Sequence, residues 1–195
     1  MKRTAEVQRN TQESLITARL DLDGRGHTDI RTGIGFLDHM LTLMGAHGFM
    51  DIGLAAQGDI EVDYHHTVED VGLVMGAMLD KALGSRQGIR RFGHAVTPMD
   101  DALAAVTVDL SKRPYLVFNL PPATGPAGTF DPQLAKEFCR ALATRGGLNL
   151  HINVRYGEDS HHILEAVFKA MGRALAQAAT LDARIEGVRS TKGTI

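Results

Sequence analysis

Two stretches, "DYHHTVEDVG" at residues 63–72 and "EDSHHILEAV" at residues 158–167, give the clearest indication of the fold. Each places two adjacent histidines ahead of a glutamate, at the start of an otherwise apolar helical pattern. His65 and His161 are 96 positions apart, and Glu69 and Glu165 are also 96 positions apart. This repeated polar pattern indicates an internally duplicated chain, because chance similarity between amphipathic helices would not reproduce it.

The repeat extends outward from the histidine pairs. A shift of 98 positions lays "FLDHMLTLMGAHGFMDI" (36–52) over "LAKEFCRALATRGGLNL" (134–150), and a shift of 88 places Glu13 over Asp101. Loops of different length between equivalent elements would produce such changing offsets. Each half therefore reads as strand, strand, helix, strand, helix, which predicts an α+β fold with one layer of sheet backed by helices. We expect one domain, 1–195, with halves at about 1–96 and 97–185 and a functional C-terminal tail.

Periodicity places the elements within each half. Apolar residues at helical spacing predict helices over about 35–47, 66–84, 133–147 and 160–179. Alternating or β-branched stretches predict strands at 14–22, 48–59, 102–111, 115–120 and 148–156. The segment "PPATGPAGTFDP" (121–132) is rich in proline and glycine, which predicts an exposed loop. The sequence leaves open whether this loop is mobile and closes over a ligand.

The composition narrows the functional classes. The 195 residues are 44% apolar and 23% charged with a formal net charge of −2, which is typical of a compact globular chain. Such a charge balance disfavours nucleic acid or an anionic membrane as a partner. The single cysteine, Cys139, excludes an intrachain disulfide and is expected to be inert helix packing. Since neither a secretory signal nor a membrane-length apolar run is present, we expect a cytoplasmic protein.

Helix geometry separates the roles of the adjacent histidines. Positions i and i+4 lie on one face, whereas neighbouring residues point about 100° apart. Each glutamate therefore pairs with the first histidine of its motif, and the second histidine points elsewhere. We expect two metal ions whose ligands are crossed between two helices: His65, Glu69 and His162 for one ion, and His161, Glu165 and His66 for the other.

Each of these ions needs a further protein ligand. Under the 98-residue shift His39 coincides with Glu137, and both lie mid-helix in mainly apolar surroundings, so we assign His39 to one ion and Glu137 to the other. His151 remains an alternative to Glu137, or a residue that supports a ligand. Imidazole and carboxylate ligands together suit manganese, iron or zinc better than calcium. The HExxH pattern is absent, which argues against a metalloprotease.

The phrases "GFLDHML", "DYHHTVEDVG", "RFG", "GEDSHHILEAVFKA" and "STKG" together resemble the imidazoleglycerol-phosphate dehydratase family, in order and over nearly the whole chain. The resemblance implies two repeated β-β-α-β-α-type units, similar to domain 2 of ribosomal protein S5. It also implies an assembly of twenty-four subunits with active sites between subunits and two Mn²⁺ ions per active site. The implied reaction, in histidine biosynthesis, converts D-erythro-imidazoleglycerol phosphate to imidazoleacetol phosphate and water. Which metal is physiological is left open.

The resemblance also implies roles for residues outside the metal ligands. Glu13 is the catalytic acid/base candidate, and which group protonates the leaving hydroxyl is left open. Lys169 has a separate argument, because it continues the stripe of 161 and 165 by one helical turn. The expected substrate-binding residues are Glu13, His39, His47, His65, Glu69, Arg91, Arg113, His161, Lys169, Ser190, Thr191 and Lys192. Many relatives have histidine, in an "EHFF"-like phrase, where this chain has Glu137.

Two other functional classes compete with this interpretation. A non-catalytic metal-storage oligomer would use the histidines but would leave Glu13 and the basic residues Arg91, Arg113 and Lys192 without a role. A di-metal phosphoesterase would bind phosphate at the metals rather than at the tail, and it would release free phosphate.

Overall fold

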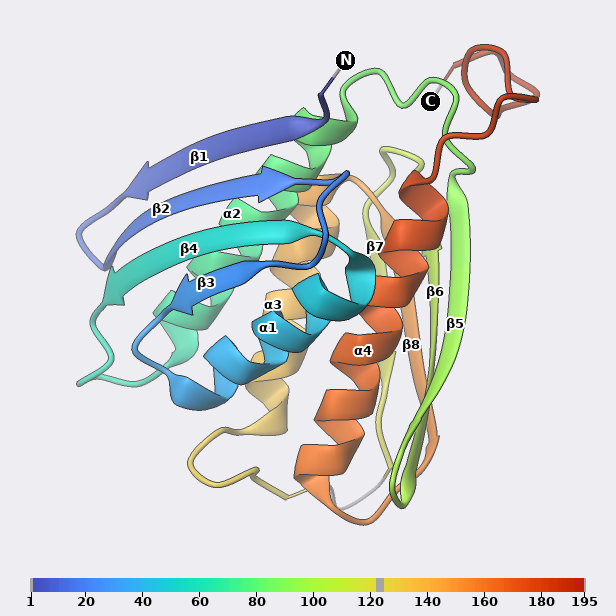
Figure 1. Ribbon diagram of the computed structural model, residues 1–195. Helices are drawn as coiled ribbons and strands as arrows, with labels where there is room; N and C mark the ends of the chain where they lie inside the picture. The colour runs from blue at the N-terminus through green and yellow to red at the C-terminus, as the bar shows by residue number, and fades with distance from the viewer. Residues whose placement is uncertain (1, 122–124, 195) are drawn as a thin grey trace.

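The computed structural model describes residues 2–121 and 125–194, with two β-sheets on the outside and four helices between them (Figure 1). The elements in chain order are β1 (Thr4–Asn10), β2 (Ser14–Asp21), β3 (Thr28–Arg31), α1 (Gly35–Gly48), β4 (Asp51–Gly58), α2 (His65–Leu83), β5 (Phe92–Met99), β6 (Ala102–Asp109), β7 (Tyr115–Asn119), α3 (Pro132–Gly146), β8 (Asn149–Tyr156) and α4 (Ser160–Ala179). No helix among the described residues is long and apolar enough to cross a membrane.

The duplication predicted from the sequence is confirmed by the sheet topology. The strand orders are β1-β2-β4-β3 and β5-β6-β8-β7, so the two sheets follow the same connection. In each sheet the last pair, β3 with β4 and β7 with β8, is parallel, and the other pairs are antiparallel. Each half therefore builds its own sheet, whereas one layer of sheet was expected.

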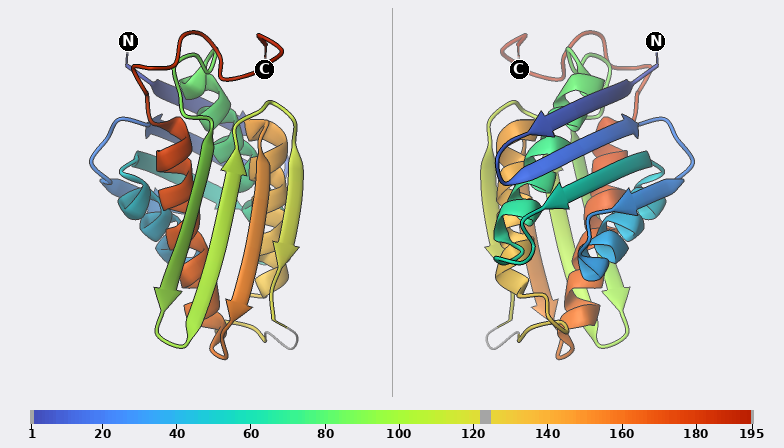
Figure 2. Two further views of the ribbon diagram at one scale, coloured as in Figure 1. Left: turned by 90° about the vertical axis from the view of Figure 1, so that its right-hand side faces the viewer. Right: turned by 90° about the vertical axis from the view of Figure 1, so that its left-hand side faces the viewer.

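The helices occupy the interior layer (Figure 2). Helices α1 and α2 pack on the first sheet, α3 and α4 pack on the second, and the halves meet where α2 contacts α3 and α1 contacts α4. Alternation along the strands explains this arrangement. In β2, for example, Ile16, Ala18 and Leu20 are buried while the residues between them are exposed, so one face of the sheet meets the helices.

Four glycines let the helices of the two halves approach closely. A Cβ on Gly172 of α4 would lie 2.2 Å from the Met44 carbonyl oxygen and 3.1 Å from the Gly48 amide of α1. A Cβ on Gly76 of α2 would lie 2.7 Å from the Gly146 amide of α3. Gly76 and Gly172 are 96 positions apart, and Gly48 and Gly146 are 98 apart, so both helix crossings obey the repeat.

The structure departs from the expected elements in two ways. Strands β1, β3 and β5 were not predicted, and they give each half three strands before its first helix instead of two. The loop at 121–132 is not wholly exposed, because Phe130 is buried and its ring packs against that of Phe36, with the centroids 5.0 Å apart. Residues 122–124 of this loop lie outside the described residues.

Candidate metal centre

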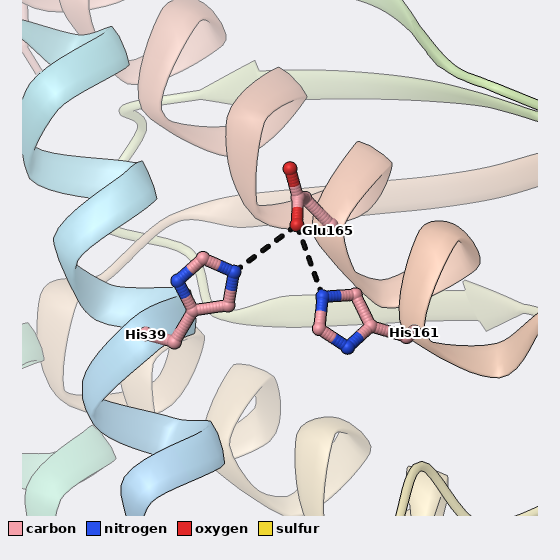
Figure 3. A group of neighbouring side chains, drawn as sticks. All are labelled: His39, His161 and Glu165. Carbon is pink, nitrogen blue, oxygen red and sulfur yellow. Dashed lines mark hydrogen bonds and ion pairs between the residues drawn. The ribbon is translucent and has the colours of Figure 1, made fainter.

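Three expected ligands converge in a cluster formed by α1 and α4 (Figure 3). His39 Nε2 lies 3.1 Å from Glu165 Oε2, and His161 Nε2 lies 3.2 Å from the same oxygen. Their ligand atoms all lie within 4.8 Å of one another. Within residues 2–121 and 125–194, this is the one group of three or more histidine, cysteine or carboxylate side chains packed this closely. His39, which was expected to be a metal ligand, therefore lies beside two other expected ligands, His161 and Glu165.

Local sequence and helix packing together position this cluster. The Asp159 side chain accepts hydrogen bonds from the amides of His161 and His162, which starts α4 so that His161 stands one turn before Glu165. His39 arrives from α1, because α1 crosses α4 closely at Gly172. The edge of the His161 ring also contacts Phe36, with ring centroids 5.3 Å apart.

Glu165 is buried but ionised. Burial opposes its ionisation, but hydrogen bonds from Lys169, His39 and His161 outweigh burial and lower the pKa of Glu165 to about 2. Lys169 Nζ lies 2.6 Å from Glu165 Oε1, so Lys169 shares a face of α4 with Glu165, one helical turn earlier. A negatively charged oxygen flanked by two imidazoles is a suitable divalent-cation ligand set.

Helices α2 and α3 carry a looser counterpart of this cluster. His65 Nε2 lies 3.4 Å from Glu69 Oε2, and both side chains are about half exposed. Glu137 and His65 line one cavity of about 590 Å³. Glu137 is not free there, since Arg140 Nη1 lies 2.5 Å from its Oε2. Two slightly larger hollows, of about 620 and 610 Å³, lie on the outer side of the first sheet and contain no expected ligand.

The second histidine of each pair turns away from its own glutamate, as helix geometry predicts. His66 Nδ1 lies 2.9 Å from Asp59 Oδ2, and its Nε2 lies 3.8 Å from Glu13 Oε1. His162 Nδ1 lies 2.6 Å from Asp101 Oδ1. Hydrogen bonds to these carboxylates raise the pKa of both histidines. Glu13 and Asp101 are 88 positions apart, and His66 and His162 are 96 positions apart. The contact of His66 with Glu13 is therefore the equivalent, under the repeat, of the contact of His162 with Asp101.

His151 does not compete with Glu137 within one chain. Its neighbours Leu150 and Ile152 are buried against the helices, so the alternation of β8 directs His151 to the opposite face of the sheet. There its ring lies 6.3 Å from that of Tyr115. The cavity shared with His65 favours Glu137 as the further ligand.

The expected phosphate-binding residues gather at the other end of α4. Arg91 donates from Nε and Nη2 to the two carboxylate oxygens of Asp109, at 2.6 and 3.1 Å. Its Nη1 donates to the backbone carbonyl of Arg189, directly before the tail residues 190–192, and the Ser190 hydroxyl accepts from the Lys192 amide. Arg113 Nη2 is 3.8 Å from Asp109. The tail carries Ser190, Thr191 and Lys192.

Sequence reasoning did not identify Asp59 or Asp109. Asp109 is the residue that joins the two expected arginines, and it ends strand β6 without a motif of its own. His47 was expected to bind substrate and lies in the last turn of α1. Burial and the nearby charges of Lys169 and Arg173 lower the pKa of His47, so the ring stands beside two cations of α4.

The chain is similar to known proteins over nearly its whole length. The family model described as imidazoleglycerol-phosphate dehydratase matches residues 32–175. The enzyme of that name from Desulfosudis oleivorans is 56% identical over 195 residues, covering 100% of both chains. The one from Syntrophobacter fumaroxidans is 53% identical over 194 residues, covering 100% of this chain and 98% of the relative.

Solved structures agree with the sequence comparison. The crystal structure of imidazoleglycerol-phosphate dehydratase from Staphylococcus aureus superimposes with a TM-score of 0.83 at 38% identity, covering 92% of this chain and 99% of that one. The structure of the enzyme from Pyrococcus furiosus in complex with (S)-C348 gives a TM-score of 0.85 at 35% identity, covering 97% and 100%. A family model that matches most of the chain, relatives above 50% identity and the shared fold lead to one conclusion: the chain belongs to the imidazoleglycerol-phosphate dehydratase family.

Proposed function

We propose that the protein is a hydro-lyase that dehydrates imidazoleglycerol phosphate to imidazoleacetol phosphate in histidine biosynthesis, using two Mn²⁺ ions per active site. Family membership supports the reaction, and the cluster of His39, His161 and Glu165 is the observation that supports metal dependence. The cytoplasm is the proposed location, as expected for an enzyme of amino-acid biosynthesis. The proposed domain is the whole chain, 1–195, with halves at about 1–96 and 97–185 and a tail that takes part in the site.

The ligand set suits the proposed ions. His39 and His161 offer two imidazole nitrogens and Glu165 a carboxylate oxygen, all on one small surface. On α2 and α3, His65, Glu69 and Glu137 would hold the second ion. When bound, the two ions would hold the imidazole ring of the substrate as an anion and act as Lewis acids toward loss of the hydroxyl. Arg140 offsets the extra negative charge that Glu137 brings to the second set.

The positions of the basic residues support an active site built from more than one copy of the chain. The Arg91 amide donates to the Ala178 carbonyl near the end of α4, whereas His161 lies in its first turn. Seventeen residues separate these two positions of α4, which corresponds to about 26 Å at the helical rise. Figure 1 shows the two ends of α4 at opposite ends of the molecule.

The substrate is too short to span this distance. Five single bonds of about 1.5 Å join its imidazole ring to phosphorus, so the two lie at most about 8 Å apart. If the imidazole binds near His161 and the phosphate binds Arg91 and Arg113, the two ends must be held by different copies of the chain. This supports the proposed homo-oligomer, for which the family resemblance implies twenty-four subunits.

Glu13 is the proposed acid/base. Its carboxylate is about half exposed and lies 3.8 Å from the Nε2 atom of His66, the second histidine of the first pair. An exposed carboxylate at this place can accept the proton from the carbon beside the carbinol and return it during tautomerisation. The proposed substrate-binding set also keeps Lys169, which lies 2.6 Å from Glu165, and His47, whose pKa is lowered by burial and by the charges of Lys169 and Arg173.

The decisive experiment gives the purified, manganese-loaded protein imidazoleglycerol phosphate and follows both imidazoleacetol phosphate and inorganic phosphate. We expect one imidazoleacetol phosphate per substrate consumed and no phosphate release. Release of phosphate would instead identify a phosphoesterase. A fully metal-loaded oligomer that forms no product would indicate a metal-storage protein.

A further inference from the structure

The second histidine of each pair is held by a carboxylate that lies outside its own motif. Asp59, in the loop after β4, contacts His66 Nδ1 at 2.9 Å, and Asp101, in the turn between β5 and β6, contacts His162 Nδ1 at 2.6 Å. In both cases the partner reaches the Nδ1 side of the ring. The Nε2 side faces a more distant carboxylate, Glu13 at 3.8 Å from His66 and Asp100 at 3.4 Å from His162.

The chemistry of the contact sets the state of the ring. An ionised carboxylate can only accept a hydrogen bond, so Nδ1 must carry the proton it donates. A neutral imidazole protonated at Nδ1 has its lone pair on Nε2. Asp59 and Asp101 therefore select the tautomer in which Nε2 can bind a cation, and they fix the direction in which that nitrogen points.

The two carboxylates are not copies of each other. Under the repeat, Asp101 corresponds to Glu13, and the position equivalent to Asp59 is Gly157, 98 residues later. The two halves thus reach the same contact with residues of different origin. A contact inherited through the duplication would join residues that are equivalent under the repeat. Because these two carboxylates are not equivalent, the contact indicates that both histidines need a carboxylate at Nδ1.

The Asp59 contact has no evident structural reason. Asp63, not Asp59, accepts the amide hydrogen bond at the start of α2. One oxygen of Asp59, Oδ1, is buried and has no hydrogen-bond partner among the described residues. A buried oxygen without a partner costs stability. Asp101 is different, because its Oδ2 also accepts the amides of Glu158 and Asp159.

We propose that Asp59 and Asp101 are positioning residues that present Nε2 of His66 and His162 as metal ligands to sites completed by another copy of the chain. The inference rests on the proposed di-metal function and deepens it, since it assigns two residues that support the ligands without binding the ions. Carboxylates that hold ligand histidines in this way typically contribute 10- to 100-fold, by order of magnitude, to metal affinity.

The test compares variants around Asp59 in the full-length oligomer. Equilibrium dialysis against chelator-buffered manganese(II) gives the number of bound ions and their dissociation constants, and size-exclusion chromatography confirms that the assembly is intact. For Asp59→Ala we expect one ion per active site to bind about 10- to 100-fold more weakly. Glu61→Gln is the matched control: it removes a negative charge from an exposed side chain of the same loop, and should leave both dissociation constants unchanged.

A double variant separates positioning from general damage. His66→Ala should lose one ion, and adding Asp59→Ala should then weaken manganese binding no further, because the carboxylate acts only through the ring. Wild-type affinity in Asp59→Ala, equal weakening in Glu61→Gln, or an additive loss in the double variant would each overturn the inference while leaving the di-metal site standing. Unchanged manganese binding in His66→Ala would overturn both the inference and the proposed role of His66.

Discussion

The close crossing of α1 and α4 makes a strong prediction at Gly172. In Gly172→Ala the new Cβ would lie 2.2 Å from the Met44 carbonyl oxygen, so the two helices must separate by about 1 Å to reach ordinary contact. Overpacking of this kind costs about 1–3 kcal/mol. The same movement would carry His39 away from Glu165, which is now 3.1 Å away, and metal ligands tolerate only about 0.2 Å of error. We therefore expect both lower stability and weaker manganese binding at this cluster.

Two measurements check this prediction. Thermal unfolding at fixed protein concentration should show a midpoint lowered by roughly 2–12 °C, from about 2–4 °C per kcal/mol for a chain of this size. Equilibrium dialysis should show that manganese binds this cluster at least roughly tenfold more weakly. The control is Gly35→Ala, at the first residue of α1, where a Cβ would meet nothing within 4 Å. A Gly172→Ala protein with wild-type midpoint and wild-type manganese affinity would refute the proposal that helix packing sets the cluster.

Further predictions concern three other sites. Replacing Glu137 by histidine should keep two ions bound but shift the metal preference of the second ligand set from manganese toward zinc, because imidazole is the softer ligand. Competition between the two metals for binding to the oligomer checks this. Asp109→Asn should raise KM by a larger factor than it lowers kcat, because the residue orients Arg91 and Arg113. The manganese content should be unchanged, and a KM equal to that of the wild type would contradict the proposed phosphate site. Burial raises the pKa of the Cys139 thiol, so this side chain stabilises the fold below the unfolded pKa of about 8.5 and less at higher pH. Iodoacetamide at pH 8.5 should therefore label Cys139 only after denaturation, and rapid labelling of the native oligomer would contradict its burial.

The elements that the sequence predicted well are those with strong local periodicity. The helix expected at 160–179 is α4, Ser160–Ala179, and the other three helices begin and end within a residue or so of their expected bounds. Strand β3 was missed because four residues, Thr28–Arg31, are too few to show alternation. Strands β1 and β5 were missed although their partners β2 and β6 were predicted, because alternating stretches rich in polar residues, such as "TAEVQRN", carry a weak apolar signal.

Long-range geometry explains what the sequence left open at the site. The repeat identified His39 and Glu137 as equivalent positions, but only the crossing of α1 on α4 shows that His39 joins His161 and Glu165. Asp59 and Asp109 had no motif, because each acts through a contact that depends on how loops and strands meet. Contacts of this kind are set by tertiary packing and not by local spacing.

The central claim is that one active site draws its metal ligands and its phosphate-binding residues from different copies of the chain. The direct measurement mixes two variants, each expected to be inactive alone: His161→Ala, which breaks the metal cluster, and Arg113→Ala, which breaks the phosphate group. If each site joins two copies, co-assembled oligomers contain sites with both parts intact, and a 1:1 mixture should recover up to about a quarter of wild-type dehydratase activity. Activity no greater than that of the separate variants, in oligomers shown to contain both chains, would contradict the claim.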